Sequence, residues 1–325
     1  MLMIPGRSCP LHYRYAPAAL AHTRDVEAAC LYVVGGLYGN LPALDAIDAL
    51  AAQEAAPPVI VFNGDFNWFN VDAGGFAAIN SRVLRHTALR GNVETELSSE
   101  DPAAGCGCGY PAFVGDAEVT RSNQIIERLR DTARGQPAIR NQLAALPMYC
   151  TAAVGAARIA IVHGDCESLA GWGLSRDALA EPAQRRRVES WFDEARVDVI
   201  ASSHSCLPVM MDFGARNGAG IAINNGAAGM PNFANSQYGV ITRISATAPP
   251  CQPLYGTRAS DLHIDALAVH YDTQRWSAEF EANWPAESPA QVSYSQRIAH
   301  GPAYRLADAS CLTDDDAAVR RSAAA

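Results

Sequence analysis

The segment Val59-Ile60-Val61-Phe62-Asn63-Gly64-Asp65 decides the fold class of this 325-residue chain. Its four apolar residues predict a buried strand, which ends in a polar asparagine, a glycine and an acid. A similar apolar run at residues 31–34 precedes it, and residues 42–52 between the two runs have helical apolar spacing. Further along, a helical stretch at residues 76–84 leads to a third strand at 87–89. This alternation of strands and helices predicts a layered α/β core.

The rest of the chain continues the pattern less regularly. Residues 98–115 read as a loop, and a helix is predicted at residues 175–195. Further helices are expected at about 119–134 and 137–146, and further strands around Gly155 and at 158–162, 197–201, 209–213, 220–223 and 239–244, the last three antiparallel. The tail beyond residue 250 reads as irregular, with a strand at 264–271 and a helix after it.

These segments indicate one main domain with an extension at each end. Residues 1–30 form an N-terminal extension without clear periodicity, and residues 31–250 form the domain. Residues 251–325 form a C-terminal extension that we expect to pack on the same domain. The loop at 98–115 and this tail are expected to shape the pocket of the domain.

Composition and charge restrict the function. The chain is 49% hydrophobic and 18% charged, as in globular proteins. A formal net charge of −9 argues against general nucleic-acid binding, because that function needs a basic face. No apolar run reaches the roughly 20 residues of a membrane span, and the N-terminus lacks a continuous apolar stretch. We therefore expect a cytoplasmic protein that does not bind membranes.

The nine cysteines do not form a disulfide framework, because their number is odd and their spacings are scattered. Two of them lie in the sequence Gly105-Cys106-Gly107-Cys108-Gly109. We interpret this segment as a glycine-rich loop tip, with a flexible metal or redox loop as the alternative.

Polar clusters recur where the predicted strands end. In layered α/β folds this edge of the sheet is where loops converge on a site. The clusters contain oxygen, nitrogen and sulfur groups that suit metals such as zinc, manganese or iron. They lie at residues 36–40, 64–65, 91–94, 163–165 and 203–206.

The order and spacing of these clusters resemble the calcineurin-like metallophosphoesterases, especially the small bacterial phosphodiesterases. That family has D-x-H-G-N, G-D-x-x-[DN], G-N-[HC]-[DE], a lone histidine in an H-G context, and G-H-x-H. The resemblance covers about residues 31–233, and residues 224–229 resemble the family's N-P-G-S-x-G turn. It implies a four-layer α/β/β/α sandwich of two mixed sheets, formed here by residues 31–250.

The resemblance implies that one of the family's two metal sites is intact and the other altered. The ligands of the intact site would be Asp65, Asn92, His163 and His204. The other site would take Gly36, Tyr38, Asp65 and Cys206, of which only Asp65 keeps the family's residue. Tyr38 and Cys206 are interpreted as filling this altered site, with a rebuilt ferric or thiolate centre as the alternative.

The function that the resemblance implies is hydrolysis of a phosphodiester or a small phosphomonoester by metal-bound hydroxide. The cofactor would be a divalent metal (Mn, Zn, Fe or Ni), one per chain or, with a rebuilt site, two. Asp65, Asn92 and His163 are the expected catalytic residues, with Glu94 as a candidate acid or an outer partner. Asn40 and Asn67 are expected to bind the small phosphorylated substrate. The rival hypothesis is an inactive protein that binds a phosphorylated ligand or a partner.

Overall fold

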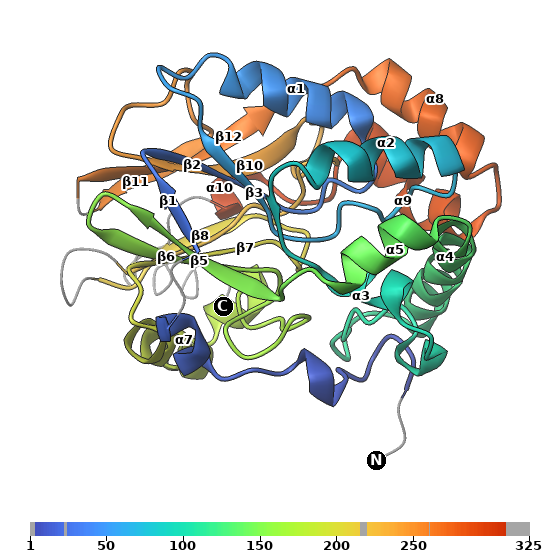
Figure 1. Ribbon diagram of the computed structural model, residues 1–325, viewed down its shortest axis with the longest axis horizontal. Coiled ribbons are helices and arrows are strands. Elements are labelled where there is room, and N and C mark those ends of the chain that lie inside the picture. Colours follow the sequence, from blue (N-terminus) through green and yellow to red (C-terminus); the bar gives the residue numbers. More distant parts are fainter. Residues whose placement is uncertain (1–3, 23–24, 215–219, 260, 310–325) are drawn as a thin grey trace, which may run out of the picture.

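Two six-stranded mixed sheets lie face to face, with helices on both outer sides (Figure 1). The computed structural model describes residues 4–22, 25–214, 220–259 and 261–309. Parts of the two predicted extensions, residues 1–3 and 310–325, lie outside this description. The four-layer α/β/β/α architecture confirms the predicted fold class.

The first sheet has the strand order β11-β12-β10-β2-β3-β4. Strands β2, β3 and β4 run parallel, whereas β10, β11 and β12 pair antiparallel. Its strands are β2 (Cys30–Val34), β3 (Val59–Phe62), β4 (Thr87–Ala88), β10 (Gly239–Ser245), β11 (Tyr255–Ala259) and β12 (Leu262–Val269).

The second sheet has the strand order β1-β5-β6-β7-β9-β8. Strands β6, β7 and β9 are parallel, so β9 departs from the antiparallel arrangement that we expected for it, although it pairs antiparallel with β8. Its strands are β1 (Val26–Ala28), β5 (Tyr149–Val154), β6 (Ala157–Val162), β7 (Val199–Ser202), β8 (Val209–Asp212) and β9 (Ile221–Asn224).

The alternation of side chains along each central strand explains the two faces of each sheet. In β2, Leu31 and Val33 enter the core between the sheets, whereas Tyr32 and Val34 pack under the helices. The second sheet follows the same rule, with Ile161 of β6 facing the first sheet. Because both faces are covered, these strands read as continuous apolar runs.

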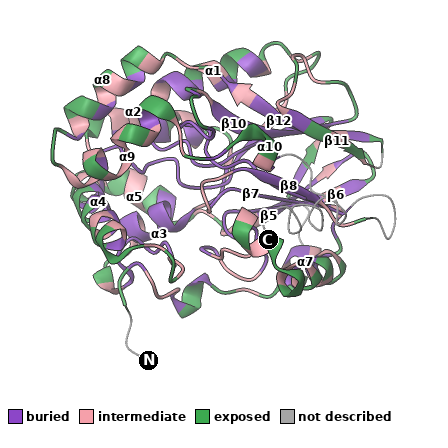
Figure 2. Cartoon of the chain, turned by 180° about the vertical axis from the view of Figure 1, so that it is seen from behind, coloured by how far each residue is buried: buried purple, intermediate pink, exposed green. Residues whose placement is uncertain are grey.

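Helices cover the outer faces, with buried residues on one side and exposed residues on the other (Figure 2). On the first sheet these are α1 (Leu41–Ala51), α2 (Ala73–Val83), α4 (Asp116–Arg134), α8 (Thr273–Asn283) and α9 (Pro289–His300). On the second sheet, the helix predicted at 175–195 is divided into α6 (Arg176–Ala180) and α7 (Pro182–Ala195), because proline has no N–H and starts a new helix. The shorter elements are α3 (Asn92–Ser98), α5 (Pro137–Ala144), α10 (Leu306–Ala309), and the 3-10 turns Leu11–Tyr13, Pro17–His22 and Pro102–Ala104.

Regular structure extends into both segments that were predicted to be mostly irregular. Strand β1 comes from the N-terminal segment, and β11 and α9 come from the tail. None of the helices in the described part of the chain has the length and apolar character that crossing a bilayer requires.

Candidate metal centre

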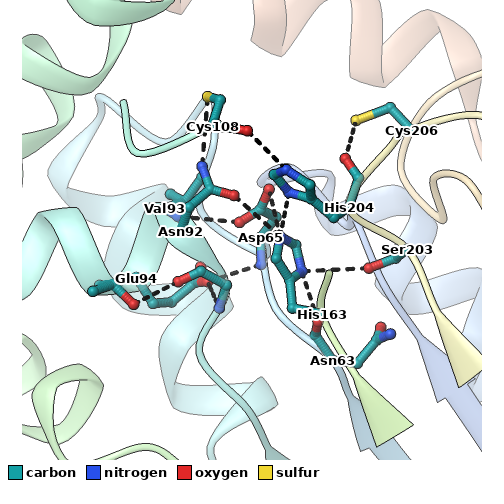
Figure 3. Close-up of polar contacts among 12 residues, drawn as sticks. Asn63, Asp65, Asn92, Val93, Glu94, Cys108, His163, Ser203, His204 and Cys206 are labelled. Atoms are coloured by element: carbon teal, nitrogen blue, oxygen red, sulfur yellow. Dashed lines mark hydrogen bonds and ion pairs between the residues drawn. The ribbon is translucent and has the colours of Figure 1, made fainter. Parts of the chain in front are cut away.

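Four side chains with metal-binding groups meet at the carboxyl edge of the sheets (Figure 3). Asp65 follows β3, Asn92 is the first residue of α3 after β4, His163 follows β6, and His204 follows β7. Each of the four has at most 6% of its surface exposed. The two sheets thus contribute two ligands each.

The hydrogen bonds of His163 determine which of its ring nitrogens can bind a metal. Its Nδ1 lies 2.9 Å from the carbonyl oxygen of Asn63, and a carbonyl can only accept a hydrogen bond. Nδ1 must therefore carry the proton, and a neutral ring then has its lone pair on Nε2. That Nε2 lies 3.1 Å from Asn92 Oδ1, 3.0 Å from His204 Nδ1 and 3.4 Å from Asp65 Oδ2.

His204 and Asn92 are oriented in the same way. His204 Nε2 lies 2.9 Å from the carbonyl oxygen of Cys108, so in the neutral ring Nδ1 is left with its lone pair. The Asn92 Nδ2 group donates to the carbonyl oxygen of Cys106 at 2.9 Å, which turns Oδ1 inward. Backbone carbonyls of this kind commonly fix metal-binding histidines in the correct tautomer.

The result is a cluster of acceptors that face one another. With neutral rings, no proton lies between His163 Nε2 and its three neighbours, so their lone pairs repel unless a cation is between them. The contacts of 3.0–3.4 Å around His163 Nε2 are close to the ~3.3 Å that separates ligands in a tetrahedron with bonds of ~2.0–2.1 Å. The chemistry of this donor set therefore fits a divalent metal.

The electrostatics of the centre favour an ionised Asp65 and a neutral His204, and they favour positive charge at His163. Burial, and then the charge on His163, lower the pKa of His204 to about 3, so this ring is neutral near pH 7. Burial alone would raise the pKa of Asp65, but His163 beside it holds that pKa below its ordinary value. Burial opposes a charge on His163, yet the Asp65 carboxylate outweighs it and raises the pKa of His163.

A small pocket of about 40 Å³ opens beside the centre. Asp65, Asn92 and His204 form its polar part. Its other walls are mostly aromatic, and among the described residues no lysine or arginine side chain lines it. The aromatic residues are Tyr38, Trp68, Tyr110, Trp172 and Tyr294. As expected, the loop at 98–115 and the C-terminal tail both contribute to this pocket.

No protein-family model and no curated protein matches the sequence. Solved structures do match. The chain is similar to a hypothetical protein from Pyrococcus horikoshii OT3, with a TM-score of 0.56, 16% identity, and coverage of 86% of this chain and 100% of the other. It is also similar to a metallophosphoesterase from Sphaerobacter thermophilus, with a TM-score of 0.51, 15% identity, and coverage of 85% and 100%. The chain has the metallophosphoesterase fold.

Within the metallophosphoesterase fold, the half of the site expected to be altered contains Tyr38 and Cys206 in direct contact. The Tyr38 hydroxyl lies 2.8 Å from Cys206 Sγ. Gly36 allows the tyrosine ring to take this place, because a Cβ there would lie 3.0 Å from the ring carbon Cζ and from the hydroxyl. Burial raises the pKa of both Tyr38 and Cys206, so both groups carry their protons at neutral pH.

The amides of Asn40 and Asn67, which were predicted to bind substrate, form hydrogen bonds within the scaffold. Asn40 caps α1 by accepting from the Ala43 N–H and donates to the carbonyl of Gly229. Asn67 exchanges hydrogen bonds with Asn80 and accepts one from Asn70. Asn40 and Asn67 are fully buried, and neither is among the described residues that line the pocket.

Glu94 supports the centre from behind. Its carboxylate accepts from the backbone N–H groups of Asp65, Phe66 and Gly91 at 2.8–3.0 Å. Burial, and then the nearby charge of Asp65, raise its pKa to about 7. Its side chain is fully buried and does not line the pocket, so the geometry favours the outer-partner alternative over the acid.

The sequence analysis did not identify the backbone carbonyls that orient the ligands. Two of them belong to Cys106 and Cys108, whose sulfur atoms are joined in a disulfide. The only signal in the sequence was the Gly-Cys-Gly-Cys-Gly segment, which we had interpreted as a loop tip. The position of this glycine-rich segment soon after Asn92 in the sequence was the available indication of a structural role.

Proposed function

We propose that this chain is a phosphoesterase that works with one divalent metal ion. The observation that carries the proposal is the convergence of Asp65, Asn92, His163 and His204, whose inward atoms all lack protons when the rings are neutral. The fold, shared with a metallophosphoesterase, supports the same class of reaction. A metal held there would supply a Lewis acid that polarises a phosphoryl oxygen and acidifies water.

The protein's own residues would prepare the site for this reaction. Asn63, Cys106 and Cys108 fix the ligand side chains through their carbonyls. Glu94 holds the turn that carries Asp65. Since the ligands are held before the ion binds, little reorganisation would accompany binding.

Tyr38 supports a single ion, since its ring and the Cys206 sulfur occupy the adjoining half of the site. A two-metal clamp on attacking and leaving oxygens would then be absent. Val93 lines the pocket. At this position the family that the sequence resembles has a cysteine or a histidine, and the histidine can protonate the leaving group. We therefore propose substrates whose leaving groups need little protonation, such as phenolates.

The charge around the pocket favours a phosphodiester over a phosphomonoester. A diester carries one negative charge and a monoester close to two at neutral pH. Among the described lining residues no cationic side chain would offset the second charge. The pocket of about 40 Å³ has room for roughly three water-sized groups, which suits a phosphoryl group with its substituents directed outward.

The test combines metal analysis with an assay on bis(4-nitrophenyl) phosphate and 4-nitrophenyl phosphate. We expect about one ion per chain and a higher kcat/KM for the diester. His163→Ala should lose the ion, and its kcat/KM should fall at least ~100-fold. Mutation of even the outer hydrogen-bond partners of a metal site lowers metal affinity or activity by 10–100-fold. His300→Ala, at the exposed end of α9, is the matched control and should match the parent.

Three outcomes would overturn the proposal. Hydrolysis that survives in His163→Ala would show that the reaction occurs elsewhere. Two bound ions per chain would mean that Tyr38 and Cys206 belong to a rebuilt centre. Tight binding of a diester without turnover under any divalent metal would instead support the inactive, ligand-binding alternative.

A further inference from the structure

The loop from Gly105 to Gly109 orients two of the four ligands of the centre. The Cys106 carbonyl accepts from Asn92 Nδ2, and the Cys108 carbonyl accepts from His204 Nε2, both at 2.9 Å. Trp172 Nε1 donates to the same Cys108 carbonyl at 3.0 Å. The positions of Asn92 Oδ1 and His204 Nδ1 therefore depend on how this loop is held.

A covalent bond holds the loop in this shape. The disulfide between Cys106 and Cys108 closes a small ring around Gly107. Gly107 has a φ of +67°, a region that glycine enters readily. The loop is also anchored by the Cys106 N–H, which donates to Asn123 Oδ1 at 2.9 Å.

The two sulfur atoms differ in access. Cys106 is fully buried, whereas Cys108 is 6% exposed and lines the pocket beside the centre. Cys108 Sγ also lies 3.6 Å from Asn92 Nδ2 (Figure 3). A small thiol that enters the pocket would thus meet Cys108 first.

We propose that Cys106 and Cys108 form a reversible thiol–disulfide site that sets how tightly the centre holds its metal. The reacting partners are low-molecular-weight thiols and disulfides that can bring a sulfur atom to Cys108 at the pocket. This inference rests on the metal centre proposed above, and it concerns metal binding, not the hydrolysis of any substrate.

The exchange is balanced in atoms and electrons. A thiolate attacks Cys108 Sγ, forms a mixed disulfide and releases Cys106 as a thiolate, which takes up a proton. A second thiolate attacks the small molecule's sulfur in that mixed disulfide and releases Cys108. Two thiols are oxidised to one disulfide, and the protein disulfide is reduced by two electrons. A small disulfide reverses both steps.

Reduction is expected to weaken metal binding. Without the cross-link, Gly105, Gly107 and Gly109, all with positive φ, give the loop freedom that binding must remove again. The carbonyls of Cys106 and Cys108 then hold Asn92 and His204 less firmly. Outer partners of this kind affect metal affinity by 10–100-fold.

The experiment measures the dissociation constant for Zn²⁺ in both redox states by competition with a chromogenic chelator. The full chain is reduced with dithiothreitol, which is then removed by anaerobic desalting. Mass spectrometry of the peptide that contains both cysteines confirms each state. We expect the dissociation constant to rise about tenfold on reduction and to return after treatment with oxidised glutathione.

Two cysteine variants and one control make the result specific. Cys106→Ser keeps the backbone carbonyl but cannot form the cross-link, so it should bind Zn²⁺ as weakly as the reduced protein in both conditions. Cys108→Ser serves as the second variant if the first does not fold, as judged by circular dichroism. Cys251→Ser removes a half-buried cysteine outside the loop and should respond as the parent does.

Equal dissociation constants in the two confirmed states would overturn the inference. Tighter binding on reduction would also overturn it, because a thiolate would then be acting as a ligand. A redox response that persists in Cys106→Ser would also overturn it. If the oxidised parent binds no Zn²⁺, or binds it equally well in His163→Ala, the proposed centre itself fails. That result is distinct from a centre that binds Zn²⁺ but ignores the disulfide.

Discussion

The His163 ring changes its chemistry with the position of a single proton. Its Nδ1 is committed to the Asn63 carbonyl, so Nε2 either binds a cation or takes a second proton. Asp65 and His204 face the same atom, and this makes the residue the centre of the cluster. Removing the imidazole should therefore reduce metal affinity more than removing any one of the outer hydrogen bonds does.

Replacing Gly36 even by alanine is predicted to destabilise the protein. Gly36→Ala would force a Cβ at φ +64° to within 3.0 Å of the Tyr38 ring. The expected loss is about 2–3 kcal/mol in the free energy of unfolding, from backbone strain together with crowding. Urea denaturation would measure it.

Gly155→Ala is the matched control for that substitution. Gly155 has a φ of +59°, and a Cβ there would meet nothing within 4 Å. The free energy of unfolding of this variant should fall by about 1 kcal/mol, because only the left-handed backbone conformation is unfavourable for alanine there. Equal losses in the two variants would contradict a tight fit between Gly36 and Tyr38.

Tyr38→Phe tests whether the phenol fills space or binds a metal. The variant removes only the hydroxyl that is hydrogen-bonded to Cys206 Sγ. If the ring is a filler, metal stoichiometry stays at about one and the free energy of unfolding falls by about 1 kcal/mol. Elemental analysis and urea denaturation measure the two quantities. A lower metal content than in the parent would show that the phenol is a ligand.

At this scale the sequence predicted side chains better than backbone groups. Asp65, Asn92, His163 and His204 lie in polar clusters that follow buried strands, and the family resemblance singled them out as the expected ligands. The carbonyl of Cys106 cannot stand out, because every residue has one and only the folded loop directs it to a ligand.

Helix α3 connects the metal centre to the helical layer. It begins at Asn92, and its Glu96 forms a buried ion pair of 2.6 Å with Arg130 of α4. Glu96 also accepts a hydrogen bond of 2.5 Å from the Tyr13 hydroxyl. The position of Asn92 thus depends on contacts one turn further along the helix.

Arg130→Ala is predicted to destabilise the protein by about 3–5 kcal/mol, because it leaves the Glu96 carboxylate buried without its cation. Thermal or urea unfolding would measure the change. Arg134→Ala is the control on the same helix, since Arg134 pairs with Asp131 at the surface. That exposed pair should contribute less than about 1 kcal/mol. Similar losses in both variants would argue against a supporting role for the buried pair.

The elements that the sequence revealed are those with a strong apolar pattern. Strand β3 is a continuous apolar run, and β6 is apolar except for Arg158; both were predicted at nearly their observed bounds. Helix α3 was not predicted, because it is seven residues long and buries residues on every side. Strand β11 was also missed, since Tyr255 is its one buried residue.

The layered architecture as a whole could be predicted because buried strands alternate with amphipathic helices over residues 30–90. How the two sheets pair face to face was not readable from composition or periodicity. It came with the family resemblance, and the interleaved core of Leu31, Val61, Ile159 and Val199 now accounts for it.

The proposed metal should stabilise the whole molecule, because its candidate ligands come from both sheets. Removing the ion with a chelator is expected to lower the melting temperature. A metal at 100 times its dissociation constant contributes about 2.7 kcal/mol. Scanning calorimetry with and without chelator would show the shift, and His163→Ala should show none. A parent protein that melts at the same temperature in both conditions would contradict a metal shared by the sheets.

The spread of the ligands along the chain also has a consequence for biosynthesis. Asp65 and Asn92 leave the ribosome long before His163, and His204 follows later still. A nascent chain can therefore hold an ion with all four groups only after the strand before His204 has joined its sheet. Binding of the proposed metal by all four groups would then be a late event of translation, and a shortage of metal would leave the two sheets around an unfilled centre.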